Sequence, residues 1–517
     1  MLKLDGETLT LPEVIQVARH QLPVDLSKKA AAKIQKSRKW VEEIISFGDP
    51  VYGINTGFGA FANHQISASD SQTLSRNLIL SHAVGTGPIL AEDIVRAAML
   101  IRANTLAKGH SGVRPEVVHT LLKMLNKNVT PHIPSQGSLG SSGDLAPLSH
   151  LALVFTTDQE DREDESGWAS YRDQDMTGKK AMEAAGIPRL VLGAKEGLAI
   201  TNGATFSAAI AALVCEDAEN LLRSSEIALA MSLEAMLGVS SAFDPRIHKI
   251  RQHLGQIKVA KTIRLLTRQS TLLDTADKVQ DAYSLRCAPQ VHGPVQETLE
   301  FVRQITNREI NAVTDNPVLF DRQTAISGGN FHGEPIGLAM DYLSIALTEI
   351  AGISERRVFR LTDSNLNADL PPMLVNTPED AGLNSGMMMP QYTAASLVLE
   401  NRSLASPDST NSLPTSAEQE DHNANSMTAA RHTQQIVQNT THVIAIELYT
   451  AARALDIRLR ETPRAKMGIG TRAAYQKIRS QIPFRAGDAW WGPEIEALRE
   501  LIEKRELVNA VKHAAQE

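Results

Sequence analysis

The sequence predicts a mainly α-helical protein in which a long-helix bundle forms the core and a smaller mixed domain precedes it. Roughly the first 220 residues alternate short periodic segments with glycine, proline and asparagine, as in Val51 to Gly59 and Thr130 to Pro147. Beyond them the pattern becomes helical, and an aromatic content of 4% with alanine-rich segments is typical of closely packed long helices. We therefore expect a loop-bearing N-terminal domain over residues 1–220 and a helical core domain over residues 221–517.

The N-terminal part contains the glycine- and serine-rich run Gly137-Ser-Leu-Gly-Ser-Ser-Gly-Asp-Leu-Ala-Pro-Leu-Ser-His150. Its composition is that of a loop, whose successive backbone N–H groups can bind an anion. A Walker-type phosphate loop is excluded because no lysine follows the glycines. A nucleophile elbow is excluded because Ser142 is followed directly by Gly143.

A different chemistry suits Ser142 and its neighbours. Because glycine lacks Cβ, the chain can bend back so that the Gly143 nitrogen attacks the carbonyl carbon of the residue before the serine. Loss of water from Ser142 would then leave an alkene conjugated to a new five-membered ring. Such an electron-poor carbon can do chemistry that otherwise needs a cofactor.

The run Asp158-Gln-Glu-Asp-Arg-Glu-Asp-Glu165 is densely acidic. It predicts a solvated, mobile loop. Its spacing lacks the EF-hand pattern, so we assign it neither calcium nor a function.

Apolar residues at helical spacing predict the long helices of the core domain. Two sets fall on single helix faces at spacings of three, four and seven: Met340, Leu343, Leu347 and Ile350, and then Val437, Ile444, Leu448 and Leu455. We interpret these stripes as buried core.

Bulk properties exclude several functional classes. The net charge of −7 and the pI near 6.1 give no electrostatic reason to expect nucleic acid. Cys215 and Cys287 do not make a disulfide framework and suit a reducing cytoplasm. Charges stand where a signal peptide would be apolar, and no long uninterrupted apolar run predicts a membrane span. With no His-Glu-x-x-His and no paired cysteine motif, we expect no metal.

The run Gly140 to His150 resembles the signature of the aromatic amino acid ammonia-lyase family, which includes histidine, phenylalanine and tyrosine ammonia-lyases and related aminomutases. Further matches follow in the family's order: Tyr52 to Gly59, Asn77 to His82, Glu196 to Gly203, Asp277 to Cys287, Thr314 to Pro317, Ser327 to Gly333 and Gln419 to His422. The resemblance covers almost the entire chain. It implies a homotetramer whose active sites combine residues from several subunits, with a small aromatic amino acid as the binding partner.

The resemblance also implies a prosthetic group. Family members cyclise an Ala-Ser-Gly triad into 4-methylidene-imidazol-5-one (MIO), so Ser141, Ser142 and Gly143 would form it here. The triad begins with Ser141 instead of Ala, which adds a hydroxymethyl group. Cyclisation should tolerate this change, but the pocket gains a polar group.

Residue roles follow from the same resemblance. Tyr52 would take the β-proton of the substrate, since neighbouring charges can tune a tyrosine pKa. Arg286 would hold both oxygens of the substrate carboxylate, and Tyr283, three residues earlier, would share its helix face. On the residues alone, Tyr52 could be a structural turn and Arg286 half of a buried ion pair. The other implied site residues are Asn202 and Gln280 as hydrogen-bonding groups, Phe331 as a packing partner and Asp144 as an orienting group during maturation.

Three features indicate the substrate. Ser81-His82 matches the selectivity pair of histidine ammonia-lyases, although a histidine can bond an imidazole or a phenol. Glu420 resembles the histidine-specific form, because a carboxylate facing a phenyl ring would lack a partner at a cost of about 1–3 kcal/mol. Met388 falls near a methionine of histidine-specific members. We therefore expect non-oxidative deamination of L-histidine to urocanate and ammonia.

Other activities stay open. Met387 to Gln391 is more apolar than the histidine type, and His422 to Met427 resembles phenylalanine enzymes. The alternatives are a phenylalanine or tyrosine ammonia-lyase, giving cinnamate or coumarate, and a 2,3-aminomutase. A fumarase–aspartase-type lyase is rejected because Ser385 to Thr393 lacks that class's lysine and asparagine. Joint retention of Ser142 and the candidate tyrosines and arginine argues against a non-catalytic scaffold.

Overall fold

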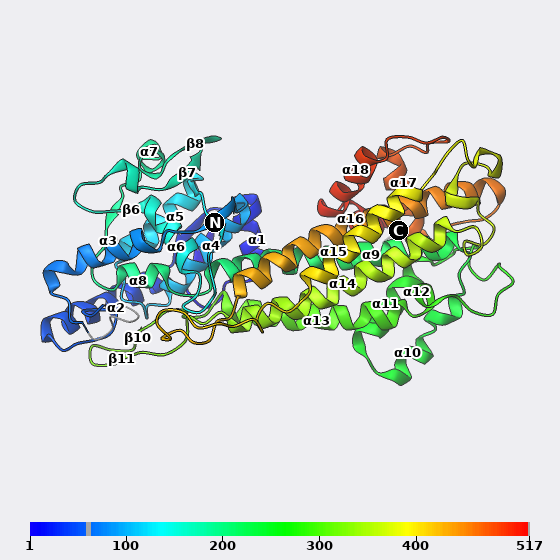
Figure 1. The fold of residues 1–517 in the computed structure, drawn as a ribbon. Helices are drawn as coiled ribbons and strands as arrows, with labels where there is room; N and C mark the ends of the chain where they lie inside the picture. Colours follow the sequence, from blue (N-terminus) through cyan, green and yellow to red (C-terminus); the bar gives the residue numbers. More distant parts are fainter. Residues whose placement is uncertain (58–63, 515–517) are drawn as a thin grey trace. The chain divides into compact units, whose positions relative to one another are not determined.

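Figure 1 shows the computed structural model, which describes residues 1–57 and 64–514. The chain divides into two compact units. Unit 1 comprises Met1–Glu216, Arg303–Asp341 and Pro407–Arg431, and unit 2 comprises Asp217–Val302, Tyr342–Ser406 and His432–Glu517. Helices dominate the described chain, so the predicted mainly α-helical class is confirmed. The expected domain boundary at residue 220 stays a prediction, since a compact unit need not fold independently.

Helix α4 (Glu92–Ala107) is the central helix of unit 1, because every residue from Ile94 to its end is buried. Its Arg102 cannot reach water and instead donates from Nη1 to the Ala199 carbonyl at 3.3 Å and from Nη2 to the Thr205 hydroxyl. Hydrogen bonds to its N–H groups offset the cost of burying a guanidinium, and both terminal nitrogens of Arg102 have them. These bonds therefore hold α8 (Glu196–Thr201) against α4. The other helices that lie wholly in unit 1 are α1 (Leu11–His20), α2 (Lys28–Phe47), α3 (Ser71–His82), α5 (Pro115–Lys127), α6 (Leu145–Phe155) and α7 (Gly178–Ala184).

The strands of unit 1 are short and join neighbouring loops. One pair positions the site: β3 (Thr86–Ile89) runs antiparallel to β5 (Pro134–Gln136), with Thr86 opposite Gln136. Because α3 ends just before β3 and the glycine-rich run follows β5, this pairing brings His82 toward that run. The remaining pairs are β1 (Leu2–Leu4) with β2 (Val24–Leu26), β4 (Thr130–Pro131) with β7 (Trp168–Tyr171), β7 with β8 (Gln174–Thr177), β6 (Thr156–Thr157) with β9 (Leu190–Val191), and β10 (Val318–Leu319) with β11 (Ala325–Ile326).

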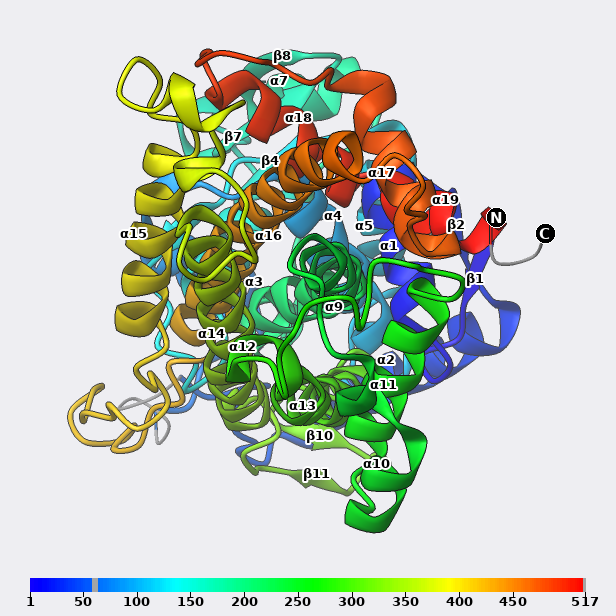
Figure 2. The same cartoon turned by 90° about the vertical axis from the view of Figure 1, so that its right-hand side faces the viewer.

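Long helices build unit 2. Helices α14 (Glu334–Thr362), α15 (Met388–Leu404) and α16 (Ser426–Glu461) lie side by side, and Val358, Val398 and Val443 meet in one apolar cluster between them (Figures 1 and 2). The helices that complete this part of the chain are α9 (Thr205–Ala235), α10 (Pro245–Arg251), α11 (Leu254–Leu266), α12 (Tyr283–Arg286), α13 (Ala288–Glu309), α17 (Ile469–Gln481), α18 (Gly492–Glu503) and α19 (Glu506–Ala514).

The two predicted apolar stripes are buried, as expected of core. Met340, Leu343, Leu347 and Ile350 on α14 are inaccessible to water, as are Ile444, Leu448 and Leu455 on α16. Helix α14 is also the one described helix that is long and apolar enough to cross a membrane. Because 61% of its most apolar window is buried within the protein, its apolar character is accounted for by core packing.

Salt bridges tie down the acidic run. Asp161 pairs with Arg189 and Lys179, and Glu163 pairs with Lys180 at 2.7 Å. Most side chains of the run face solvent, as predicted. These ion pairs attach it to the neighbouring segment around α7.

Candidate functional site

The triad Ser141, Ser142 and Gly143 lies in the turn between β5 and α6, where only glycine fits at the third position. Gly143 has a φ of +85°, and a Cβ there would come 2.0 Å from the Gly203 carbonyl carbon. The Gly203 amide donates to the Ser142 carbonyl at 2.9 Å, and the Asp144 amide donates to the Gly203 carbonyl at 3.0 Å. Within the described residues, no hydrogen bond engages the Gly143 amide. The backbone is therefore bent tightly, and the Gly143 nitrogen is not engaged in a hydrogen bond with the described residues.

Asp144 anchors this turn from inside unit 1. Its carboxylate is fully buried and accepts hydrogen bonds from the Ser138 hydroxyl at 2.8 Å and the Ser207 amide at 2.8 Å. Burial raises the pKa of Asp144, and these hydrogen bonds act against the rise. Asp144 thus links the start of α6 to the start of α9 beneath the triad.

Glu420 reaches the triad from a distant part of the sequence. The Ser142 hydroxyl donates to Glu420 Oε1 at 2.9 Å. Glu420 sits on a turn closed by Thr415, whose amide donates to the Glu420 carbonyl at 2.8 Å while the Glu420 amide donates back at 3.2 Å. A carboxylate is therefore held directly over Ser142.

His82, at the C-terminal end of α3, lies close enough to Glu420 for the two side chains to interact electrostatically. Burial lowers the pKa of His82, and the negative charge of Glu420 acts in the opposite direction. The Ser81 hydroxyl and His82 Nδ1 are 3.0 Å apart and share a hydrogen bond. The pair that the sequence indicates for substrate selectivity thus lies in unit 1, where His82 is within range of the Glu420 charge.

Asn202 precedes the glycine that braces the triad. It is buried, and its Nδ2 donates to the Asn316 carbonyl at 3.2 Å and to Asp315 Oδ1 at 3.4 Å. Asp315 is also paired with Lys195, at 2.6 Å, and both side chains are inaccessible to water. Sequence reasoning did not find this buried pair, because lysine and aspartate 120 residues apart carry no local signal.

Tyr52 and Phe331 belong to two segments of unit 1, one next to α8 and the other bonded to the glycine before the triad. Tyr52 is half-buried in a turn where a Cβ on Gly53 would meet Leu198 of α8 at 2.6 Å. Phe331 is half-buried two residues before Gly333, whose amide donates to the Gly140 carbonyl at 2.9 Å. The end of the predicted Tyr52 motif, Phe58 and Gly59, lies outside the described residues.

The remaining candidates belong to unit 2. Tyr283 on α12 is 71% exposed, and the Arg286 guanidinium lies 4.6 Å from its ring centroid. Arg286 Nε donates to the Asp281 carbonyl at 2.8 Å, so the same-face prediction for these residues agrees with the geometry. Gln280 is exposed, and Met388, at the start of α15, is 37% exposed. The structure therefore gathers the candidates into two groups, one in each unit.

Two further groups complete the triad's surroundings and were not found from the sequence. Asn423 Nδ2 donates to the Ser141 hydroxyl at 2.6 Å, and the Ser207 hydroxyl lies 2.9 Å from that of Ser426. As for metals, residues 1–57 and 64–514 contain no group of three or more histidine, cysteine or acidic side chains placed to hold an ion.

The family model and the sequence relatives agree on the family to which the chain is similar. A model of the family described as aromatic amino acid lyase matches residues 9–480. The chain is 45% identical to a histidine ammonia-lyase of Natranaerobius thermophilus over 515 residues, 99% of each chain. It is 46% identical to a histidine ammonia-lyase of Alkaliphilus oremlandii, again over 99% of each.

Solved structures are similar along the whole chain. The tyrosine aminomutase of Streptomyces globisporus superposes with a TM-score of 0.92 at 35% identity, covering 99% of this chain and 98% of that one. The histidine ammonia-lyase of Trypanosoma cruzi superposes with a TM-score of 0.89 at 36% identity, covering 99% and 95%.

Proposed function

The chain belongs to the aromatic amino acid lyase family, and on that premise we propose that it is an ammonia-lyase that converts L-histidine to urocanate and ammonia. The observation that carries the proposal is the 2.9 Å hydrogen bond from Ser142 to Glu420, with His82 nearby. A carboxylate at this place has a partner in an imidazole N–H, whereas a phenyl ring offers none. Histidine ammonia-lyases that match nearly the full length at 46% and 44% identity support the same substrate.

The triad fits the formation of MIO. The tight turn at Gly143 and its unengaged amide suit attack on the Ser141 carbonyl carbon, which forms one N–C bond and releases one water. Loss of a second water would then remove the Ser142 Cα hydrogen together with its hydroxyl group and leave the alkene, and Glu420 hydrogen-bonds the oxygen that departs. Once formed, MIO supplies an electron-poor alkene that turns the substrate's amino group into a better leaving group.

The chain's own residues would do the rest. Tyr52 takes the β-proton, the amino group leaves as ammonia, and the electron pair of the broken C–H bond becomes the Cα–Cβ double bond, so no oxidant is needed. Arg286 binds the carboxylate, and the nearby Tyr283 ring contacts the substrate. The hydrogen-bonding and packing roles assigned above to Asn202, Gln280, Phe331 and Met388 complete the proposal.

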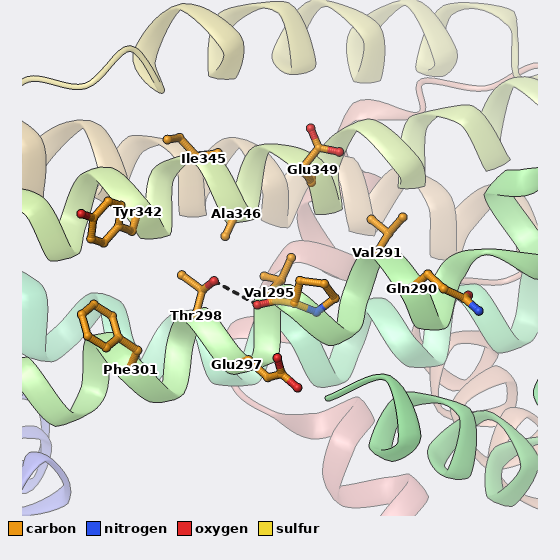
Figure 3. A pocket seen from close by; sticks show the side chains of 11 residues that line it. Gln290, Val291, Val295, Glu297, Thr298, Phe301, Tyr342, Ile345, Ala346 and Glu349 are labelled. Atoms are coloured by element: carbon orange, nitrogen blue, oxygen red, sulfur yellow. Dashed lines mark hydrogen bonds between the residues drawn. The ribbon is translucent and has the colours of Figure 1, made fainter. Parts of the chain in front are cut away.

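We also propose a cytoplasmic homotetramer with shared sites. Tyr283 is largely exposed in the single chain, whereas its proposed place in the active site requires that another subunit cover it. In unit 2, an open apolar groove of about 710 Å³ runs between α13 and α14 (Figure 3). Phe301 and Tyr342 line it with rings 6.2 Å apart and are roughly half exposed, as is typical of a surface that a partner covers. Cys215 and Cys287 are not joined in a disulfide, which suits the cytoplasm.

One assay tests the substrate. We expect the ultraviolet absorbance of urocanate to rise with L-histidine, while L-phenylalanine and L-tyrosine yield little cinnamate or coumarate. Glu420→Gln should lower kcat/KM for L-histidine by at least tenfold, because a neutral amide binds the imidazole less strongly than a carboxylate. Turnover of phenylalanine in place of histidine would contradict the proposal. A β-amino acid product would identify the aminomutase that the Streptomyces globisporus structure keeps as the second candidate.

A further inference from the structure

We propose that Asn423 is a positioning residue that binds the Ser141 hydroxyl and thereby fixes Glu420 over the triad. The inference rests on the proposed function, since it concerns how that site recognises the imidazole. It makes the unusual serine of the triad part of the substrate-recognition machinery.

The side chain of Asn423 joins the triad to the segment that carries Glu420. Asn423 is completely buried, and its Nδ2 donates to the Ser141 hydroxyl at 2.6 Å. On the other side, its Oδ1 accepts from the Leu413 amide at 3.3 Å. Its backbone amide donates to the Ser412 hydroxyl at 2.8 Å. Asn423 therefore joins the two ends of the loop through its backbone and side-chain amides, and its side chain also binds the first residue of the triad.

The loop between these bonds presents Glu420. Ser412, Leu413 and Asn423 close its base, and the reciprocal Thr415–Glu420 backbone pair closes its tip. Glu420 thus stands on a short, doubly closed turn. Because hydrogen bonds close this turn at its base and at its tip, we expect a shift of the base at Asn423 to shift the Glu420 carboxylate relative to Ser142.

The Ser141 hydroxyl matters because it is the acceptor for a buried donor, Nδ2 of Asn423. An alanine at 141 would leave the Asn423 Nδ2 with one acceptor fewer in a place from which water is excluded, and buried donors without acceptors are costly. Ring closure joins the Gly143 nitrogen to the Ser141 carbonyl carbon, so the Ser141 hydroxyl is not consumed. The bond to Asn423 is compatible with the mature triad as well as with its precursor.

A backbone hydrogen bond also connects the segment that follows this loop to the run that precedes the triad. The Asn425 amide donates to the Leu139 carbonyl at 2.7 Å. It keeps the segment close to the triad when the Asn423 side chain is replaced. Loss of the Asn423–Ser141 bond should therefore loosen the position of Glu420 without detaching the segment.

The test is a double-mutant cycle with Ser141→Ala, Asn423→Leu and the double variant. Intact mass is measured first, because formation of MIO removes two waters from the chain, and all three variants should show that loss. Each single variant is then expected to raise KM for L-histidine about tenfold, with kcat changed by less than about threefold, and to lower the preference for L-histidine over L-phenylalanine. The double variant should cost no more than Asn423→Leu alone, since the bond from the Leu413 amide is lost in both and the double variant leaves no unpaired group between residues 141 and 423.

Asn411→Ala is the matched control. Asn411 lies on the same segment and is exposed, and its side chain donates to the Pro407 carbonyl at 2.9 Å, away from the triad. Its effect should be small and should multiply independently with that of Ser141→Ala.

Two results would overturn the positioning role: independent effects of Ser141→Ala and Asn423→Leu, or an equal loss for L-histidine and L-phenylalanine. If Asn423→Leu melts at a much lower temperature, Ser141→Ala decides alone, because it removes one oxygen atom, and an unchanged KM and preference there refute the proposal. A wild-type chain that lacks the two-water loss, or that does not act on L-histidine, would instead refute the proposed function.

Discussion

Gly143 shows how a single missing side chain can decide the chemistry of this protein. Gly143→Ala should block ring formation, because the added Cβ would stand 2.0 Å from the Gly203 carbonyl carbon at a φ of +85°. We expect intact mass spectrometry to show no loss of two waters and activity to fall by at least a thousandfold.

Gly352→Ala is the control for that change. A Cβ at Gly352, inside α14, meets nothing within 4 Å, and alanine is a better helix former than glycine by about 1 kcal/mol. The variant should mature fully and melt no lower than wild type. Normal maturation of Gly143→Ala would mean that the turn is not the constraint described here.

Residues that are neighbours in sequence could be predicted, and residues that meet across the fold could not. The bend at Ser142 and Gly143 follows from small side chains in a row. The bond from Ser142 to Glu420 joins residues 278 apart, and that from Asn423 to Ser141 joins residues 282 apart. Composition and spacing carry no information on such pairs. The resemblance to a known family suggested Glu420 by precedent, but nothing of that kind pointed to Asn423.

At the scale of helices and strands, periodicity predicted the long buried helices but not the short strands that join the loops. The stripes on α14 and α16 were predicted because a long buried face repeats many times. The pairing of β3 with β5 was not, since strands of three or four residues contain too few alternations to be seen. That short pair nevertheless orders His82 and the triad, so the least predictable elements carry part of the site.

Buried charge connects the long helices of unit 2. Arg357 on α14 pairs with Glu447 on α16 at 2.5 Å, and both side chains are inaccessible to water. Glu447 also accepts from the Ser232 hydroxyl of α9 at 2.7 Å, and Arg357 Nη1 donates to the Ser284 carbonyl of α12 at 3.3 Å. The pair thus fixes α12, which presents Tyr283, to the bundle. A buried pair of this kind specifies the arrangement of helices more than it adds stability.

His292 on α13 makes the bundle sensitive to acid. Burial lowers the pKa of His292 well below 6.5, and the nearby Arg357 charge lowers it further. The unfolded chain therefore binds a proton near pH 6.5 that the folded chain does not, so the free energy of unfolding falls as pH drops below that value. His292→Leu should remove part of the stability lost between pH 7.5 and 5.0, up to about 2 kcal/mol, as followed by urea unfolding at fixed protein concentration.

His20→Gln is the comparison for that titration. His20 ends α1 and is exposed, and the acid-induced loss of stability should persist in this variant because His292 is unchanged. An acid-induced loss of stability that is the same in His292→Leu and wild type would show that other groups cause it.

For the whole molecule, the distribution of site residues between the two units leads to a test of assembly. Ser142, Glu420 and His82 belong to unit 1, whereas Tyr283 and Arg286 belong to unit 2. If a site draws its unit 1 residues from one chain and its unit 2 residues from another, two differently inactivated chains can rescue each other. Co-expressed Ser142→Ala and Tyr283→Phe chains, each inactive alone, should then regain about a quarter of wild-type activity, because a random mixture completes that fraction of sites.

Rescue requires both variants within one tetramer. This requirement distinguishes rescue from residual activity of either variant alone. The two purified variants combined without unfolding should stay inactive, and sedimentation of the co-expressed protein should give a single tetrameric species. Sites built within one chain would each keep one lesion whatever the mixture, so an inactive co-expressed tetramer would refute the shared site. The same experiment with Arg286→Lys in place of Tyr283→Phe should give the same recovery, since Arg286 and Tyr283 lie together on α12 and would enter the site from the same subunit.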